Sequence, residues 1–395
     1  MHEFKDIGNR ELRKPIAVGI VGSGPISTER HIPGFQKLRR ETRIEAVCDM
    51  NETLAKKTAD HFGIPRSFGT LSEMLKSCDL DIVDVCVPPR AHKAVANQAM
   101  ESGCHVLVEK PIAISEAECD EMIRASERYG VKLSVVHNQI FYPPYVKAQE
   151  LVNSGKVGKF AGMRVINFTH QEGYLKKMNH WIHKLPGGVV EESGPHAIYM
   201  SLPFIGRVHD ISATPTKILS YPWVSFDTCS IDLKGANGSS SIIISHAGDY
   251  FATEVDLFGT KGMIRLDLQS MLLDVQQRRS LEYTTLATTS IKTSVRMGTG
   301  VLSNAVSSML GKSFLGHDVI IQRFVDCVRD DSPPPVSLEE AKETTRVMEK
   351  ISSLCAQFSV DASRLRASLS HNSSLPPVQN GMSPHEPPID SKHGQ

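Results

Sequence analysis

Five short apolar runs alternate with longer helical patterns from Pro15 to about Val136, and this alternation most constrains the fold. The runs are "IAVGIVG", "IEAVCD", "DIVDVCV", "HVLVEKP" and "KLSVVH". The segments between them carry polar residues on one face, and several end at glycine, which is typical of amphipathic helices. The runs do not alternate strictly between apolar and polar residues, as expected for strands covered on both faces. The pattern predicts an α/β fold with a doubly wound parallel sheet.

A different pattern begins after Phe160 and predicts a second sheet. The runs "FAGMRVINF", "VSFDTCSIDLKG", "GSSSIIISHAG" and "TEVDLFGTKGMIRLDL" are strand-like, and "KGANGS" and "FGTKG" supply turns between them. We therefore expect a large, mostly antiparallel sheet in an α+β domain. Residues 275–312 have weak periodicity, so we expect an irregular excursion there. Helical patterns return in "HDVIIQRFVDCVRD" and "SLEEAKETTRVMEKISSLCAQF".

These patterns divide the chain into four parts. Residues 1–14 form a short lead, residues 15–136 the domain of the parallel sheet, and residues 137–365 the domain of the second sheet. Residues 366–395 are polar and rich in serine and proline. Such a segment cannot bury enough apolar surface to order itself, so we expect a disordered tail.

The spacing Gly22-x-Gly24-x-x-Ser27 follows the first predicted strand and opens a helix. Gly22 permits a tight turn, and Gly24 lets the backbone approach a pyrophosphate, which the exposed N–H groups of the helix start attract. Pro25 suits the first helical turn, and Ile26 lies in the same turn. The alternative is a glycine turn that exists for steric reasons alone.

Asp49 ends the next predicted strand, about where an acidic side chain accepts hydrogen bonds from the adenosine ribose. It could also cap the helix that begins near Asn51. A carboxylate repels a 2′-phosphate, and neither Met50 nor Asn51 supplies an arginine for one. We therefore expect NAD in preference to NADP.

Charge and cysteine usage indicate the kind of partner and compartment. Lysine plus arginine number 44, equal to aspartate plus glutamate, so the formal net charge is zero and a nucleic-acid or acidic-membrane partner is not expected. None of the eight cysteines falls in a C-x-x-C pair, and Met1 leads into the charged "MHEFKD". This composition favours the reducing cytoplasm. No apolar run approaches the roughly 20 residues that span a bilayer.

Several motifs in order resemble the glucose-fructose oxidoreductase / inositol dehydrogenase / MocA (Gfo/Idh/MocA) family, over residues 15–360. They are "GxGxxS…H" at 22–31, "CD" at 48–49, "PPxxH" at 88–92, "HVLVEKP" at 105–111, "SGKVGK" at 154–159 and "GG…ExGxH" at 187–196. The resemblance implies an N-terminal Rossmann domain and a C-terminal domain with a large open sheet. It also implies dehydrogenation of sugars, polyols or their derivatives with NAD(P), in a homodimer or homotetramer.

Two of these motifs, "VPPRAH" and "VEKP", stand at the carboxyl ends of predicted parallel strands, where open α/β sheets bind ligands. The resemblance adds them to the glycine turn and Asp49 as cofactor contacts. The residues concerned are Pro88, Pro89, His92, Glu109 and Lys110.

Oxidation of a secondary alcohol needs a base for the hydroxyl proton, and histidine suits that near neutral pH. Glu192 and His196 are four apart and would share one face of a helix. The resemblance implies that His196 is the acid/base, that Glu192 replaces the family's aspartate, and that Lys110 bonds the reacting oxygen. If Pro195 lies in the first helical turn, the nearby helix N-terminus disfavours a charged His196.

Plainer interpretations stand beside these. A lone histidine after glycine and proline is often a packed residue, and a lone Lys-Pro is usually a solvated loop. A metal site formed by His180, His183 and His196 with Glu191 or Glu192 lacks a further ligand in register, so we expect no metal. Candidates for the substrate wall are Asn138, Tyr142, Tyr145, Trp181 and His183, with core packing equally open for the tyrosines.

Two positions depart from the resemblance near the expected substrate. Ile140 stands where the family often carries arginine, and Tyr199 where it often carries aspartate. Specificity for inositol or glucose therefore cannot be carried over. Two other functions stay open, an NAD-assisted glycoside cleavage or epimerisation with transient oxidation, and a non-catalytic NAD-binding regulator.

Overall fold

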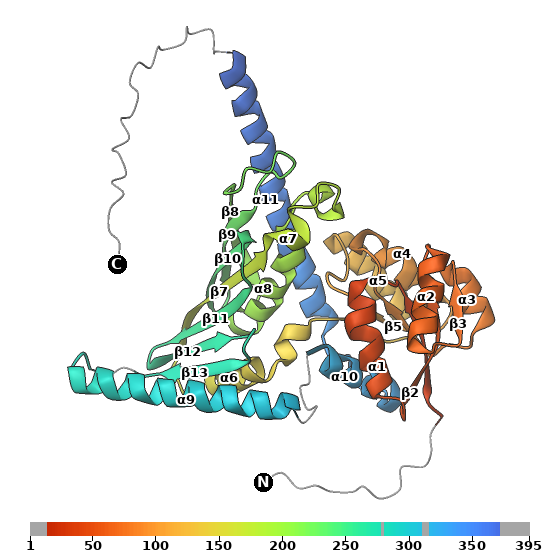
Figure 1. Ribbon diagram of the computed structural model, residues 1–395, viewed down its shortest axis with the longest axis horizontal. Helices are drawn as coiled ribbons and strands as arrows, with labels where there is room; N and C mark the ends of the chain where they lie inside the picture. The colour runs from red at the N-terminus through yellow and green to blue at the C-terminus, as the bar shows by residue number, and fades with distance from the viewer. Residues whose placement is uncertain (1–13, 278–279, 310–315, 372–395) are drawn as a thin grey trace, which may run out of the picture.

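The computed structural model describes residues 14–277, 280–309 and 316–371 (Figure 1). The predicted lead, apart from Lys14, and the tail beyond residue 371 lie outside the described residues. Two sheets organise the described chain, and each has its own buried apolar core.

The N-terminal sheet is parallel, with the order β3-β2-β1-β4-β5-β6, and confirms the predicted doubly wound architecture. Four of its strands have almost entirely buried residues, because helices cover both faces. The strands are β1 (Ile16–Val21), β2 (Thr42–Cys48), β3 (Arg66–Phe68), β4 (Ile82–Val85), β5 (His105–Val108) and β6 (Leu133–Val135).

The helices between these strands begin and end at residues that suit helix termini. The side chains of Asn51, Thr70 and Ser115 each accept a hydrogen bond from the first turn of the helix that follows, and Gly63 and Gly130 end two helices in the left-handed conformation. The elements are η1 (Ser27–His31), α1 (Ile32–Lys37), α2 (Glu52–Phe62), α3 (Leu71–Ser77), α4 (Pro89–Glu101) and α5 (Glu116–Tyr129).

The second sheet has the order β13-β12-β11-β7-β10-β9-β8, and only the β7–β10 pair is parallel among its described strands. The mostly antiparallel prediction is therefore confirmed. Its strands are β7 (Phe160–His170), β8 (Val208–Thr216), β9 (Thr228–Gly235), β10 (Gly238–Gly248), β11 (Ala252–Gly259), β12 (Gly262–Asp267) and β13 (Leu272–Gln276). The helical segments before β8 are η2 (Asn138–Phe141), α6 (Pro143–Asn153), α7 (Gln171–Tyr174), η3 (Trp181–Lys184) and α8 (Val190–Ile205).

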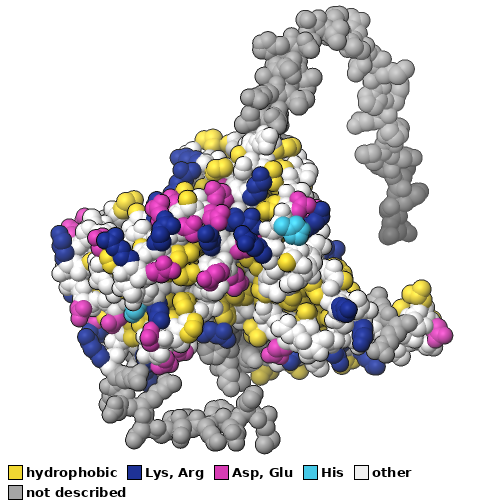
Figure 2. Space-filling view, turned by 180° about the vertical axis from the view of Figure 1, so that it is seen from behind, with side chains coloured by type: hydrophobic (Ala, Val, Ile, Leu, Met, Phe, Trp, Pro, Cys, Tyr) yellow, Lys and Arg dark blue, Asp and Glu magenta, His cyan; other side chains and the backbone are white. Residues whose placement is uncertain are grey.

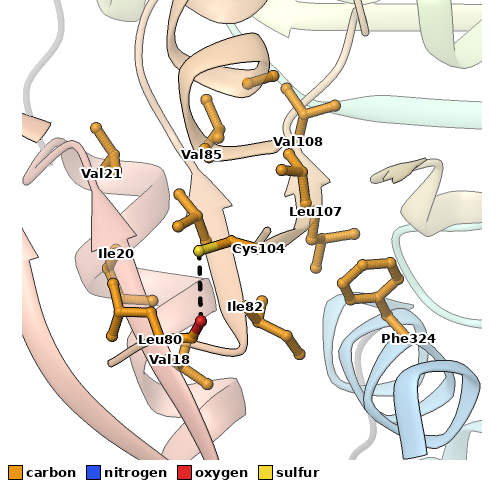
Figure 3. Packing of buried hydrophobic residues seen from close by; sticks show 14 of the residues in the cluster. Val18, Ile20, Val21, Leu80, Ile82, Val85, Cys104, Leu107, Val108 and Phe324 are labelled. Atoms are coloured by element: carbon orange, nitrogen blue, oxygen red, sulfur yellow. Dashed lines mark hydrogen bonds between the residues drawn. The ribbon is translucent and has the colours of Figure 1, made fainter. Parts of the chain in front are cut away.

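The helix α10 (Gly316–Asp330) differs from our domain assignment. We predicted it with the second domain, but Ile320, Ile321, Phe324 and Val325 are buried in the core of the first sheet. Figure 3 shows Phe324 beside Leu107 of β5. The chain therefore returns to the N-terminal domain after it has completed the second sheet.

The last helix, α11 (Leu338–His371), joins both cores. Ala341 in its first turns belongs to the first core, whereas Val347 and Ile351 belong to the second. The helix contacts α5 and β6 on one side and α8 and β8 on the other. It continues to His371, so the predicted tail begins inside a helix for residues 366–371.

Residues 275–312 are not the irregular excursion that we predicted, because α9 (Tyr283–Met309) runs along β13 (Figure 1). Polar side chains of α9 bond the sheet: Arg296 donates to the carbonyl of Val275 at 2.8 Å, and Asn304 to that of Met271 at 3.1 Å. These bonds use the free edge of the sheet. Apolar residues such as Leu302, 66% exposed, face outward. Because exposed apolar residues lie on the outer face of α9, its sequence does not show the apolar periodicity that is typical of a packed helix.

The surface and the cysteines agree with the composition. Figure 2 shows basic and acidic side chains interleaved on the face that it displays. All eight cysteines are buried. Within the part of the chain that the structure describes, every helix is too short or too polar to traverse a bilayer.

The packing of α10 gives a first prediction. Phe324→Ala should lower the free energy of unfolding by about 3–5 kcal/mol, because it leaves a cavity between α10 and the strands. Urea unfolding followed by circular dichroism measures this. Phe358→Ala is the matched control, since Phe358 is 38% exposed and should change stability by less than about 1 kcal/mol. Equal losses in the two variants would contradict the packing described here.

Candidate functional site

The glycine turn lies at the carboxyl end of β1 and has the geometry that anion binding requires. Gly22 has φ +106°, donates to the carbonyl of Cys48 at 2.7 Å, and leaves no room for a side chain, because a Cβ would lie 2.5 Å from the carbonyl oxygen of Cys86. Gly24 is the opposite case, since a Cβ there would meet nothing within 4 Å. The backbone is therefore open to a ligand above Gly24. Ser27 is fully buried, as expected for a small residue that packs the helix on the strand.

Asp49 follows β2 and faces the glycine turn. Its Oδ2 accepts a hydrogen bond from the backbone N–H of Ser23 at 2.8 Å, and its Oδ1 accepts one from Asn51 at 2.8 Å. The cap of α2 is Asn51 and not Asp49, because the Asn51 side chain accepts from Leu54. A carboxylate has about four acceptor positions, so Asp49 retains capacity for ribose hydroxyls. Met50 beside it is 96% exposed.

These residues fit NAD on geometry alone. The open space over Gly24 would receive the pyrophosphate, and Asp49 would receive the adenosine ribose. Pro25 is exposed and Ile26 half-buried on the turn itself, while Pro88 is exposed and Pro89 half-buried at the start of α4.

A buried histidine ties the strand ends beneath this cradle. His31, at the end of η1, places Nδ1 2.8 Å from Asp84 Oδ2 on β4 and Nε2 2.9 Å from Glu109 Oε1 after β5. Burial alone would lower the pKa of His31, but the charge and hydrogen bond of Asp84 raise that pKa well above its usual value. The side chain is therefore a cation between two carboxylates, and this explains a histidine on the buried side of the first helix.

Glu109 and His92, which we expected to contact the cofactor, bond other groups of the protein in this structure. The Glu109 carboxylate bonds His31, and its Oε2 accepts from the backbone N–H of Lys110 at 3.0 Å. His92 is buried, with Nδ1 2.8 Å from the carbonyl oxygen of Pro111 and Nε2 2.8 Å from that of Val87. Both residues position the loops after β4 and β5, and their direct contact with the cofactor stays a prediction.

Lys110, Glu192 and His196 come together between the two sheets. Lys110 Nζ donates to Glu192 Oε1 at 3.0 Å and to the Glu192 carbonyl at 2.9 Å. Glu192 and His196 lie one turn apart on α8. Burial and the nearby positive charge of Lys110 hold the pKa of His196 well below its usual value. The cluster therefore combines an ammonium group with a neutral imidazole, which can steady an oxygen and accept its proton.

The position of Pro195 corrects one part of this prediction. α8 begins at Val190, so Pro195 lies in the second turn and not in the first. His196 follows it, and the helix dipole acts mainly within the first turn. The neutral state of His196 therefore results from burial and from Lys110, and not from the helix N-terminus.

The expected substrate-wall residues divide into three groups. Asn138 and Tyr142 border the His196 region, with Asn138 Nδ2 3.5 Å from the Tyr142 hydroxyl. Tyr145 is a core residue, fully buried and bonded to the carbonyl of Met200. His183 is half-buried on η3, with Nε2 3.1 Å from the carbonyl of Lys177, and the side chain of Trp181 lies outside the described residues.

Sequence reasoning missed several residues that build the site. We assigned no role to Asp84, although an aspartate inside the apolar run "DIVDVCV" indicates a buried partner. Tyr199 was noted only as a departure, yet its hydroxyl lies 2.6 Å from His196 Nδ1. The residues missed are His31, Asp84, Tyr199 and His317.

Comparison with known proteins gives the site its class. The family model described as "Oxidoreductase family, NAD-binding Rossmann fold" matches residues 16–137, and the "GFO/IDH/MocA C-terminal domain" matches residues 145–265. Fold and site together define an NAD-binding oxidoreductase. The chain belongs to the Gfo/Idh/MocA oxidoreductase family, which confirms the resemblance seen in its motifs.

Individual relatives are distant. The oxidoreductase YrbE of Bacillus subtilis is 24% identical over 65% of this chain and 75% of its own length. D-glucoside 3-dehydrogenase of Escherichia coli is 29% identical over 37% of this chain and 41% of its own length. The WlbA dehydrogenase of Bordetella pertussis, solved with NADH and UDP-GlcNAcA, superposes with a TM-score of 0.71 at 20% identity, over 87% of this chain and 96% of that one.

The Asp49 geometry predicts the preferred cofactor. Asp49→Ser combined with Met50→Arg should shift the ratio of NADP to NAD dissociation constants toward NADP by about tenfold or more, since a repelling carboxylate is replaced by a phosphate-binding cation. Isothermal titration calorimetry with each nucleotide measures the ratio. As a control, Asp60→Ser removes an exposed carboxylate from α2 and should leave the ratio of the two dissociation constants unchanged. Tighter binding of NADP by the unaltered protein would refute the assignment.

Buried neutral histidines predict the pH dependence of stability. Burial lowers the pKa of His246 from 6.5 to about 4, so the native state resists a proton that the unfolded chain accepts below pH 6.5. Its stability contribution is complete above pH 6.5 and is lost at about 1.4 kcal/mol per pH unit as the pH falls toward 4. His246→Gln should flatten that dependence in urea unfolding.

Two comparisons make this measurement specific. His61→Gln alters an exposed histidine and should leave the pH dependence as it is in the unaltered protein. His31 acts in the opposite direction, because its raised pKa gives a contribution that is complete below pH 6.5 and lost at higher pH. An unchanged slope in His246→Gln would show that the buried His246 does not resist protonation.

Proposed function

We propose that this protein transfers a hydride between a secondary alcohol of a sugar, polyol or sugar nucleotide and the nicotinamide of NAD. The observation that carries the proposal is the Lys110–Glu192–His196 cluster, which lies beyond the carboxyl end of β5. D-glucoside 3-dehydrogenase, and WlbA with its bound UDP-GlcNAcA, support this substrate class. The neutral imidazole and the ammonium group match the needs of alcohol oxidation.

His196 and Lys110 act on the same oxygen of the substrate in different ways. His196 accepts the hydroxyl proton, and Lys110 Nζ stabilises negative charge on the same oxygen while the carbonyl forms. Bound NAD supplies the acceptor for the hydride. In the reverse direction His196 returns the proton, so the same arrangement serves reduction.

Glu192 acts on Lys110 in this proposal. Its carboxylate and its backbone carbonyl both accept from Lys110 Nζ, so they hold the ammonium group in place. Glutamate in place of the aspartate that the resemblance implies thus keeps a carboxylate within reach of the lysine. Asn138, Tyr142, Trp181 and His183 are proposed to border the substrate.

The setting of the protein belongs to the same proposal. Eight cysteines without a C-x-x-C pair, all of them buried, suit a reducing cytoplasm. The open second sheet suits assembly into a homodimer or homotetramer, as the family resemblance implies. A panel of polyols, sugars and sugar nucleotides incubated with NAD tests the activity, and net NADH formation identifies the substrate. Product without NADH would favour a transient oxidation, and NAD binding without product a regulator.

Removal of the His196 imidazole or of the Lys110 ammonium group should slow the chemical step and leave NAD binding intact. His196→Ala and Lys110→Ala should each lower kcat by about a hundredfold or more, the scale of a positioned acid/base, while the dissociation constant of NAD changes little. Steady-state kinetics and calorimetry measure the two quantities. Lys93→Ala, which removes a lysine paired with Glu121 on the surface, is the control and should keep full kcat. Turnover at the unaltered rate by both site variants would refute the assignment.

A further inference from the structure

The hydroxyl of Tyr199 is a meeting point for three groups beside His196. It lies 2.6 Å from His196 Nδ1, 3.0 Å from Asn138 Oδ1 and 3.2 Å from the backbone nitrogen of Gln139. Tyr199 is fully buried on α8, one turn beyond His196, whereas Asn138 and Gln139 belong to η2. A hydroxyl has a single proton, so these three contacts restrict one another.

Counting donors and acceptors assigns that proton. The backbone N–H of Gln139 can only donate, so the Tyr199 oxygen accepts from it. Asn138 Oδ1 can only accept, so Tyr199 donates its proton to it. With the hydroxyl proton used, the bond to His196 forms only if Nδ1 carries a proton and donates to the tyrosine oxygen.

The orientation of the Asn138 amide supports this count. Its Nδ2 lies 3.4 Å from His317 Nδ1 and 3.5 Å from the Tyr142 hydroxyl, so the opposite end of the amide, Oδ1, faces Tyr199. His317 Nε2 in turn lies 3.7 Å from Glu109 Oε1. His317 of α10 thus helps to orient the Asn138 amide. If the oxygen and nitrogen of this amide were exchanged, its NH2 group would face the Tyr199 hydroxyl.

The tyrosine ring is also held in place. It stacks on the buried ring of His137, with centroids 4.2 Å apart and an interplanar angle of 19°. Burial raises the pKa of the Tyr199 phenol well above its usual value, so the hydroxyl keeps its proton. Burial and Lys110 also lower the pKa of His196, so its ring is neutral with one proton to place. The other groups that act on His196 are Glu109, His317 and His137.

We propose that Tyr199 and Asn138 form a positioning pair that holds His196 in the Nδ1–H tautomer, which leaves the lone pair of Nε2 to take the substrate proton. The inference rests on the proposed role of His196 as the acid/base. A histidine base needs a second group that fixes its tautomer and orientation, and a carboxylate often serves. Here a neutral phenol serves, and the amide of Asn138 decides which way its proton points.

The experiment is nitrogen-detected NMR of the full chain labelled in histidine, with His196 assigned by the signals lost in His196→Ala. It needs neither substrate nor turnover. In the unaltered protein the His196 proton should reside on Nδ1. In Tyr199→Phe the acceptor is gone, and a mixture of tautomers is expected. In Asn138→Leu the Tyr199 hydroxyl is kept, but it loses the oxygen to which it donates. The hydroxyl should then donate its proton to His196 Nδ1, so the His196 ring should carry its own proton on Nε2.

Tyr145→Phe is the matched control, because it removes another buried hydroxyl of the same domain, bonded to Met200, and should leave the His196 signals unchanged. A proton on Nε2 in the unaltered protein overturns the proposal. So does an unaltered tautomer in Asn138→Leu, and this variant decides the matter if Tyr199→Phe fails to fold.

Kinetics add a second readout once a substrate is identified. Tyr199→Phe should lower kcat by about ten- to a hundredfold with a smaller change in KM, the scale of a misplaced catalytic group. A KM effect with full kcat would contradict a positioning role. The tautomer measurement stands apart from the proposed function. If the tautomers change as expected and no substrate is ever oxidised, the positioning holds and the dehydrogenase proposal fails.

Discussion

The hydrogen-bonded cation at His31 is the interaction on which the rest of the site depends. Asp84 and Glu109 stand at the ends of neighbouring strands, where two buried carboxylates would repel each other. His31 lies between them and neutralises part of that charge. Removal of one member of such a set leaves an uncompensated buried charge, which is strongly destabilising. The turn that would hold the dinucleotide and the loop that presents Lys110 are therefore anchored to one imidazole.

The same network extends into the acid/base region. Glu109 accepts from the backbone of Lys110 and also lies near His317, which comes from α10 late in the chain. His317 contacts Asn138, and Asn138 contacts Tyr199 beside His196. Ionic interactions thus predominate beneath the cofactor cradle, and neutral hydrogen bonds through Asn138 and Tyr199 continue the network to Nδ1 of the proposed base. The charged Lys110–Glu192 pair also lies in this region, and burial together with the charge of Lys110 lowers the pKa of His196.

Local patterns predicted much of the fold. The apolar runs and glycine turns gave the parallel sheet correctly, because each strand and helix is amphipathic or buried over its own length. α9 was not predicted, because its polar residues face the sheet edge and its apolar residues face outward. Within the site, Lys110, Glu192 and His196 were predicted together and lie together. His31 could not be assigned a role, since its partners lie 53 and 78 residues away. Tyr199 contacts His196 three residues away, but the partners that fix its proton lie 60 and 61 residues away.

The helix α11 has a mechanical consequence. Its first turns are part of one apolar core and the next turns part of the other, without a loop between them. Two bodies that share a continuous rod cannot open by rotation about a flexible connection. Relative motion of the two sheets must instead proceed by small sliding of packed side chains along that rod, as in shear movements. Under the proposed function, entry of a substrate between the sheets would then depend on the packing along α11.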